Sequence, residues 1–191
     1  LGGISNLTFL PGSDNSEAVL AFDTGPANLL LNIGMQQSST GELYDKDGQT
    51  ASKGEANNRL LNAWLNHSYL NLKPPKSTGR EEFGSELMKT WLNEAKSAGL
   101  SLPDLMTTLT AFTAESINRA YRDHLPRLAK ESFLSGGGSF NKELKKQMQD
   151  RLPEVKFRDF SELGQPAEAR EAIGFAVLGN QFLMGKSTTF P

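Results

Sequence analysis

The longest helical pattern in the sequence starts at Ser101 and narrows the choice of folds more than any other feature. Ser101 and Asp104 flank Pro103 in a capping-box pattern, which is typical of a helix start. The apolar residues that follow recur at helical spacing: Leu105, Leu109, Phe112, Ile117, Ala120 and Tyr121. Because such an apolar face has to be covered by other elements, the chain must fold in layers.

Short apolar segments on both sides of this helix predict strands. Residues 4–10 and 18–22 predict a hairpin closed by a turn at 11–15, and residues 132–134 and 155–157 predict two later strands. Helical spacing predicts further helices at 28–35, 55–65, 83–95, 141–152 and 166–184. The order of these elements predicts an α/β class, with helices packed on a mixed sheet.

Composition excludes several classes of site. The 191 residues contain no Cys, which rules out disulfides, Cys-bound zinc, iron–sulfur clusters and thiol nucleophiles. The two histidines, His67 and His124, lie far apart in sequence, so we expect any cation to be bound by oxygen. The net charge of −2 comes from scattered residues, which predicts no nucleic-acid or membrane partner.

No apolar run reaches the roughly 20 residues that a membrane span needs, and no export pattern is present, so we expect a cytoplasmic protein. The chain begins with Leu1 and runs directly into a predicted strand. We therefore expect it to be part of a longer protein.

Asp23 is the first candidate for chemistry. It follows a predicted strand and precedes Thr24 and Gly25, at the kind of strand end where open α/β sheets place their ligands. Its carboxylate can accept a proton from water or a hydroxyl, or hold Mg²⁺. An Asp at this position can equally cap the helix that follows, and the sequence leaves both interpretations open.

The run Gly136-Gly137-Gly138 is the second candidate, between a predicted strand and a helix that starts near Asn141. Glycines let a phosphate or a flat base approach the backbone, although a flexible turn explains them equally well. The pair Gly2-Gly3, with Asn6 shortly after it, is a weaker pattern of the same kind.

Two further candidates are charged. The loop at 74–81 combines cations with hydroxyls, and these residues either grip an anion or form a solvated surface. Glu171 lies on the predicted last helix, where it either faces solvent or serves a polar site.

Six strings of residues together resemble one family, the anhydro-N-acetylmuramic acid kinases, and the resemblance is to their C-terminal half. The strings are Gly2–Thr8, Phe22–Asn28, Asp45–Gly48, Pro75–Glu81, Ser135–Asn141 and Glu171–Ala172. The resemblance implies that residues 1–191 form one lobe, the second, of an acetate-kinase/hexokinase/actin-like (ribonuclease H-like) fold. It also implies a missing N-terminal lobe that carries the first phosphate loop.

The resemblance further implies a reaction. ATP with Mg²⁺ is the expected cofactor, and the amino sugar 1,6-anhydro-N-acetylmuramic acid is the expected substrate, which is opened and phosphorylated on its 6-oxygen. By the resemblance, Asp23 is the general base. The other residues carried over are Gly2, Gly3 and Asn6 for a phosphate turn, Gly136, Gly137, Gly138 and Asn141 for adenosine, Lys76, Ser77, Thr78 and Arg80 for the cleft, and Glu171 for a sugar hydroxyl.

The sequence departs from the family pattern at Ala27 and Asn32, where Gly and Asp are usual. We expect Asp23 and the triple glycine to open onto one common face, and we expect the chain to be inactive alone. A homodimer is compatible with the resemblance. Two other readings stay open, namely a non-catalytic nucleotide-binding or dimerisation module and a kinase for another sugar.

Overall fold

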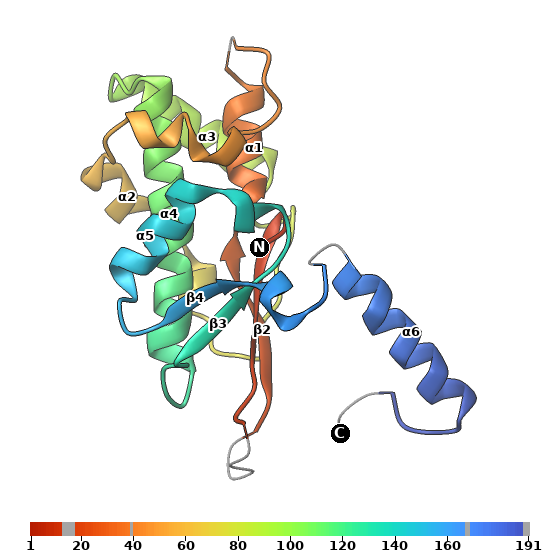
Figure 1. The fold of residues 1–191 in the computed structure, drawn as a ribbon. Helices are drawn as coiled ribbons and strands as arrows, with labels where there is room; N and C mark the ends of the chain where they lie inside the picture. The colour runs from red at the N-terminus through yellow and green to blue at the C-terminus, as the bar shows by residue number, and fades with distance from the viewer. Residues whose placement is uncertain (13–17, 39, 167–168, 189–191) are drawn as a thin grey trace.

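The computed structural model describes residues 1–12, 18–38, 40–166 and 169–188, so residues 13–15 of the expected hairpin turn lie outside the described part. Strands β1 (Ile4–Phe9) and β2 (Leu20–Pro26) pair antiparallel, and β3 (Glu131–Leu134) and β4 (Lys156–Asp159) pair parallel (Figure 1). Within the described residues these strands form two separate sheets. The expectation of one mixed sheet is wrong, because alternating apolar residues predict a strand but not its partner.

Strand β2 runs further than the sequence predicts, and this changes the setting of Asp23. Ser5 pairs with Gly25, and the register shifts between Ser5 and Asn6, so that Asn6 lies opposite Asp23. Pairing with β1 therefore carries β2 on to Pro26. The expectation that Asp23 ends the strand is wrong, since it lies inside the hairpin.

The long helix α4 (Leu102–His124) is confirmed as the central element, with the capping box in place at Ser101 and Asp104. Helices α1 (Asn28–Gln36), α2 (Asn58–Trp64) and α3 (Ser85–Ser97) lie around its N-terminal part (Figure 1). One apolar cluster fills the space between them, here called the helical core: Leu30, Leu31, Met35, Ala51, Leu60, Leu61, Trp64, Leu65, Tyr69, Leu70, Phe83, Met88, Trp91, Ala95, Leu105, Met106, Leu109, Ala111 and Phe112.

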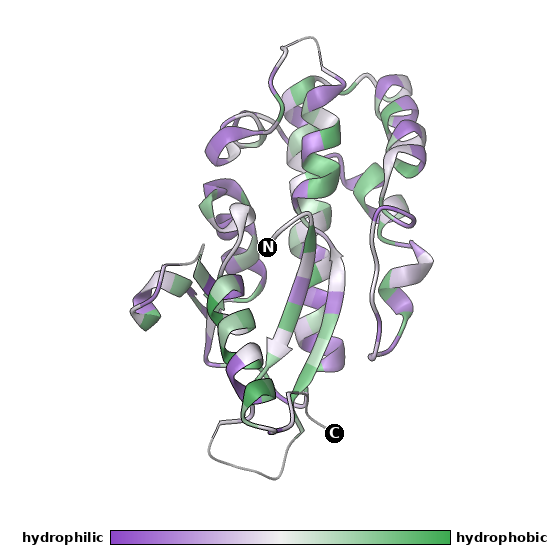
Figure 2. Ribbon diagram, turned by 90° about the vertical axis from the view of Figure 1, so that its right-hand side faces the viewer, coloured by the Kyte–Doolittle hydropathy of each residue, from purple (hydrophilic) through white to green (hydrophobic). Residues whose placement is uncertain are grey.

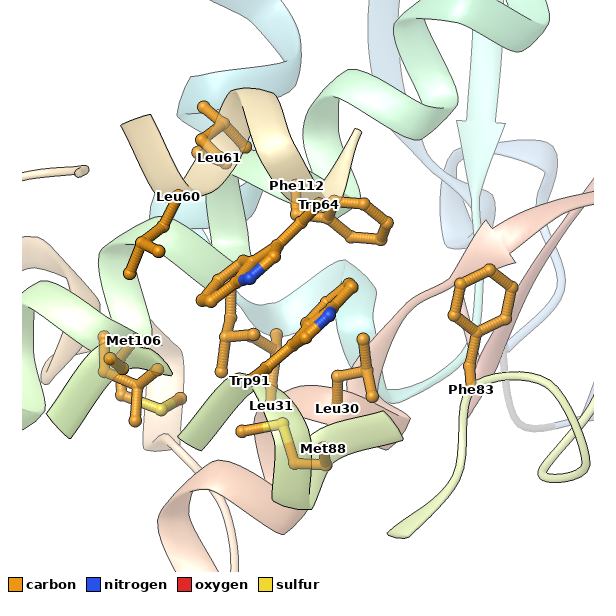
Figure 3. Close-up of a cluster of buried hydrophobic side chains, with 14 of the residues drawn as sticks. Leu30, Leu31, Leu60, Leu61, Trp64, Phe83, Met88, Trp91, Met106 and Phe112 are labelled. Carbon is orange, nitrogen blue, oxygen red and sulfur yellow. The ribbon is translucent and has the colours of Figure 1, made fainter. Parts of the chain in front are cut away.

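Two indole rings lie at the centre of the helical core. Trp64 stacks on Trp91 with ring centroids 4.5 Å apart and planes 5° from parallel, and Phe112 meets Trp91 edge-on (Figure 3). The indole nitrogen of Trp64 donates a hydrogen bond to Glu94 at 2.7 Å, so its one polar atom is satisfied.

A second apolar cluster, here called the strand core, joins the hairpin to the C-terminal part of α4 and to α5 (Lys142–Arg151). Buried and exposed residues alternate along β1, as a strand with one covered face requires, and Figure 2 shows hydrophobic and hydrophilic residues on both strands of the hairpin. The cluster consists of Leu7, Phe9, Phe22, Ala114, Ile117, Ala120, Tyr121, Leu125, Leu134, Leu144, Met148, Leu152 and Val155. Helix α4 therefore ties both cores together.

The last helix differs from all the others. Helix α6 (Arg170–Leu183) starts later than the predicted residue 166, buries none of its residues, and lies to one side of the body (Figure 1). Phe175 and Phe182 are each 75% exposed. The apolar face predicted for this helix is therefore present but uncovered. Among the described residues, no helix is both long and apolar enough to cross a membrane.

Short 3₁₀ segments complete the chain between these elements. They lie at Lys46–Gly48, Ala51–Lys53, Ser68–Asn71, Gly137–Phe140 and Phe160–Leu163. The segment at 68–71 opens the stretch 68–81, which lies against β2.

Candidate functional site

The Asp23 carboxylate is held from two sides. Its Oδ1 accepts a hydrogen bond from the Asn6 side-chain amide at 3.0 Å, and its Oδ2 accepts one from the backbone N–H of Thr78 at 2.9 Å. Each oxygen keeps a further lone pair, so the group is fixed in place and still able to accept a proton. Helix α1 has Ala27 at its N-cap with no side-chain cap bond, so the alternative that Asp23 caps α1 is wrong.

The backbone of Asp23 is held as well. Its N–H donates to the carbonyl of Lys76 at 3.1 Å, and its carbonyl accepts a hydrogen bond from the Tyr69 hydroxyl at 2.8 Å. The side-chain oxygen of Thr78 is buried and makes no hydrogen bond. One polar atom beside Asp23 therefore has unused hydrogen-bonding capacity. We call Asp23, Asn6, Tyr69, Lys76 and Thr78 the Asp23 group.

The loop at 74–81 contributes through its backbone more than through its charges. The Lys76 ammonium lies 4.8 Å from the centre of the Tyr69 ring, and burial lowers its pKa while the nearby Asp123 carboxylate opposes that shift. Ser77 and Arg80 are exposed. Only Lys76 and Thr78 of the four predicted loop residues belong to the Asp23 group.

Glu171 lies on α6 rather than in the Asp23 group. Its side chain is 81% exposed and lies 3.8 Å from the guanidinium of Arg170. Of the two readings that the sequence left open, the structure shows the solvent-facing one.

The Gly2-Gly3 turn packs against the start of α1. The carbonyl of Gly3 accepts the backbone N–H groups of Ala27 and Leu29, and the carbonyl of Gly2 accepts that of Asn28, at 2.9–3.0 Å. Since the first N–H groups of a helix have no partner within it, this turn satisfies three of them. Those three donors are consequently taken up within the chain.

The three consecutive glycines differ from one another. Gly136 has φ +83°, and a Cβ there would lie 2.8 Å from the Leu1 carbonyl; the N–H of Gly138 donates to the same carbonyl at 2.8 Å. Gly137 is exposed, and its added Cβ would approach only the Asn28 amide, at 3.4 Å. Close backbone packing thus explains Gly136 and Gly138, and leaves Gly137 facing open space. We call Gly2, Gly3 and Gly136–Gly138 the glycine group.

A cavity of about 420 Å³ lies beside Gly137, and Asn32, Phe140 and Asn141 are also among its lining residues. Phe140 is 60% exposed. The Asn141 side chain is buried and accepts the N–H of Leu144 at 2.9 Å, which confirms it as the N-cap of α5.

Asn6 belongs to the Asp23 group and also lines a cavity. Its amide contacts Asp23, and the residue lines, with Leu1 and Ser135, a second cavity of about 420 Å³. The N-terminal ammonium of Leu1 donates to the Ser135 carbonyl at 2.7 Å, next to the triple glycine. Neither Asp23 nor any of the three glycines is among the lining residues of this cavity, so their opening onto one common face stays a prediction.

The residues beside Gly137 fit a nucleoside better than a phosphate. The N–H groups of Gly138, Ser139 and Asn141 are already bonded to chain carbonyls, whereas the surface of Gly137 carries no side chain and lies near the Phe140 ring. Across the described residues no cluster of three or more His, Asp or Glu side chains is arranged to hold a metal. Mg²⁺ in kinases is held largely by substrate phosphates and one or two carboxylates, and Asp23 is a carboxylate available for that.

Comparison with known proteins gives the family. A sequence profile of the anhydro-N-acetylmuramic acid kinases matches residues 1–191, and the chain belongs to that family. Proteins of that name from Caldanaerobacter subterraneus subsp. tengcongensis and from a Cyanothece sp. are 36% and 41% identical over the whole chain, which covers 49% and 52% of their lengths. A Synechococcus elongatus protein of the same name is 42% identical over 93% of the chain and 48% of its own length. The chain spans about half the length of these relatives.

Sequence reasoning missed one member of the Asp23 group, Tyr69, and the contacts made by two others, Thr78 and Asn6. Tyr69 was overlooked because a single tyrosine between Ser68 and Leu70 belongs to no motif; it is 3% exposed. Thr78 acts through its backbone N–H, a group that every residue except Pro carries, so its type gives no signal. Asn6 was assigned to phosphate, whereas its amide bonds to Asp23; the spacing of facing strand residues would have revealed this only with the register known.

Proposed function

We propose that this chain is the C-terminal lobe of a kinase that opens 1,6-anhydro-N-acetylmuramic acid and phosphorylates it, with the lobe built on an acetate-kinase/hexokinase/actin-like fold. Membership of the family supports the activity. The observation that carries the proposal is the Asp23 carboxylate, fixed by Asn6 and Thr78 with lone pairs to spare.

In the proposed reaction Asp23 is the general base. As the oxygen of a water molecule attacks the anomeric carbon, Asp23 takes its proton, and the bond from that carbon to the bridging 6-oxygen breaks. ATP with Mg²⁺, when bound, would supply the phosphoryl group to the freed 6-oxygen and would leave as ADP.

The nucleotide side of the proposal rests on Gly137. Its bare backbone and the exposed Phe140 ring offer a surface for the flat adenine base, in the cavity that Asn32 also lines. Asn32 stands where the family pattern has Asp, so this cavity carries one negative charge fewer at that position. Gly2 and Gly3 then hold the start of α1 through their carbonyls, and Asn6 holds the Asp23 carboxylate.

The missing lobe is the proposed partner, because the relatives are about twice as long as this chain. One observation favours the alternative of an association module. Helix α6 presents Phe175 and Phe182 to solvent, a face that suits a second copy or another lobe. In the kinase proposal, the other lobe belongs to the same polypeptide and supplies the rest of the substrate-binding site.

The test is reconstitution. The chain is fused behind the N-terminal half of the Cyanothece sp. relative, and ADP release is measured with the anhydro sugar, while mass spectrometry checks that the sugar gains one water and one phosphoryl group. We expect turnover by the fusion, and none by the 191-residue chain alone, since only part of the cage around the γ-phosphate is present. A silent fusion beside an active full-length relative would overturn the proposal, and full turnover by the chain alone would show that one lobe suffices.

A further inference from the structure

The Tyr69 side chain hydrogen-bonds the backbone of Asp23 from the neighbouring segment. Its hydroxyl donates to the Asp23 carbonyl at 2.8 Å, while its ring is buried in the helical core and meets Phe83 edge-on, with centroids 5.6 Å apart. Its own N–H donates to Nδ1 of His67 at 3.4 Å. Tyr69 thus anchors one point of β2 to the packed helices.

Lys76 closes a ring of contacts around the same point. Its carbonyl accepts the N–H of Asp23 at 3.1 Å, and its ammonium donates to the Tyr69 carbonyl at 3.4 Å while lying over the Tyr69 ring. Two residues further on, Thr78 delivers its N–H to the Asp23 carboxylate. The peptide groups on both sides of Asp23 are therefore hydrogen-bonded to Lys76 and Tyr69, and these two residues also contact each other.

This arrangement controls the direction in which the carboxylate points. Fixing the peptides on either side of a residue fixes its Cα–Cβ direction, and the two bonds from Asn6 and Thr78 then select one side-chain rotamer. A general base depends on such placement, because a displacement of about 1 Å costs on the order of a hundredfold in rate.

We infer that Tyr69 is a positioning residue for the general base: its hydroxyl, with Lys76 as the second member of the ring, holds the backbone of Asp23 and the segment 76–78 so that the carboxylate faces the substrate in one orientation. The inference rests on the proposed function. The positioning role belongs to the Tyr69 hydroxyl and not to its ring, because a ring without the hydroxyl would fill the same space in the helical core.

The state of the hydroxyl suits this role. Burial, followed by the charges of Asp23 and Glu82, raises the pKa of the Tyr69 hydroxyl, so it remains a protonated donor at every pH at which the enzyme would work. A donor in a half-buried setting also carries a penalty if its partner moves away. The contact is accordingly persistent.

The test is a double-mutant cycle in the fusion protein. Tyr69→Phe removes only the hydroxyl, and we expect kcat to fall about fivefold, the effect of one neutral hydrogen bond, with KM for sugar and ATP within twofold. The matched control is Tyr121→Phe, which removes a hydroxyl that bonds to Ser132 in the strand core, and it should leave kcat within twofold. In an Asp23→Asn background the Tyr69→Phe change should have no further effect, because the base through which it acts is gone.

A second readout does not depend on turnover. In the 191-residue chain, amide hydrogen exchange at Thr78 should be severalfold faster in Tyr69→Phe than in wild type, and unchanged in Tyr121→Phe. The inference is overturned if Tyr69→Phe lowers kcat by the same factor with and without Asp23→Asn, if it matches Tyr121→Phe, or if Thr78 exchange does not change. A wild-type fusion without turnover is a distinct result, since it overturns the proposed function and this role with it.

Discussion

The Asp23 group and the glycine group are held in opposite ways. Asp23 is fixed by specific side chains and donors, those of Asn6, Tyr69 and the Thr78 amide. The glycine group is fixed by carbonyls and by the absence of side chains, because the Leu1 carbonyl oxygen lies 2.8 Å from the place that a Cβ of Gly136 would take. The first arrangement can lose chemistry without losing its fold, whereas most changes in the second disturb the fold first.

Asp23→Asn is the sharpest way to break the Asp23 group. The amide keeps the shape of the side chain but cannot take a proton, so we expect kcat of the fusion protein to fall by about 10² to 10⁴ while ATP binding stays largely intact. Steady-state kinetics and a calorimetric nucleotide titration measure the two effects. Near-normal turnover would show that Asp23 only positions other groups.

Gly136→Ala should act on stability instead. At φ +83° an L side chain is strained, and its Cβ would crowd the Leu1 carbonyl, so we expect the free energy of unfolding to fall by about 1–3 kcal/mol. Urea unfolding measures this. Gly99→Ala is the matched control, since Gly99 has φ +72° with nothing near its Cβ position. Equal costs at the two positions would mean that the contact with Leu1 adds nothing.

Gly137→Val separates binding from folding within the same glycine run. The side chain would enter the cavity beside Phe140 and Asn32 rather than clash with the backbone. We expect nucleotide affinity of the fusion to drop about tenfold, or ~1.4 kcal/mol, with little change in the urea midpoint. Unchanged affinity in a folded protein would make Gly137 part of a turn only.

Mild acid should loosen the Asp23 side of the molecule, where both histidines pack. Burial lowers the pKa of His67, and the charge of Glu82 opposes this shift only in part. The pKa of His124 is lowered by burial and by the positive charge of Lys76. Because the folded values lie below the unfolded value near 6.5, stability is complete above that pH and declines as the pH falls through and below it.

Thermal unfolding at pH 7.5, 6.5 and 5.5 measures this effect, which we expect to be the smallest of the four. Each ring contacts a residue next to or bonded to Asp23. His67 accepts the N–H of Tyr69, and the ring centroid of His124 lies 5.7 Å from that of Phe22. A His67→Gln, His124→Gln double variant should lose the dependence in this range. An equally steep decline in that variant would assign the effect to other groups.

Local signals in the sequence predicted most of the helices. The capping box at Ser101 and the N-cap at Asn141 are both present, since a cap depends on residues within one turn of each other. Helix α2 is shorter than predicted, starting at Asn58 because the Asn57 side chain caps it. Helix boundaries follow from such short-range bonds, which sequence spacing makes visible.

Long-range contacts set the rest and left no such signal. The pairing of Ser5 with Gly25 that places Asp23 inside β2, and the backbone bond from Thr78 to Asp23, join residues far apart in sequence. Asp23 was selected as a candidate by its type and by its place after a predicted strand, and the family resemblance assigned it the role of base. Its hydrogen-bond partners could not be predicted in this way, because an amide, a tyrosine hydroxyl and a backbone N–H are all common groups whose meaning depends on what lies opposite.

The stacked indoles determine what light can report about this molecule. The chain has two tryptophans, and Trp64 and Trp91 both lie in the helical core with their rings 4.5 Å apart. Tryptophan emission therefore reports on the contact between α2 and α3. A rearrangement confined to the hairpin, to Asp23 or to α6 has no tryptophan to disturb, so an unchanged emission spectrum shows that the helical core is intact and says nothing about the rest of the molecule.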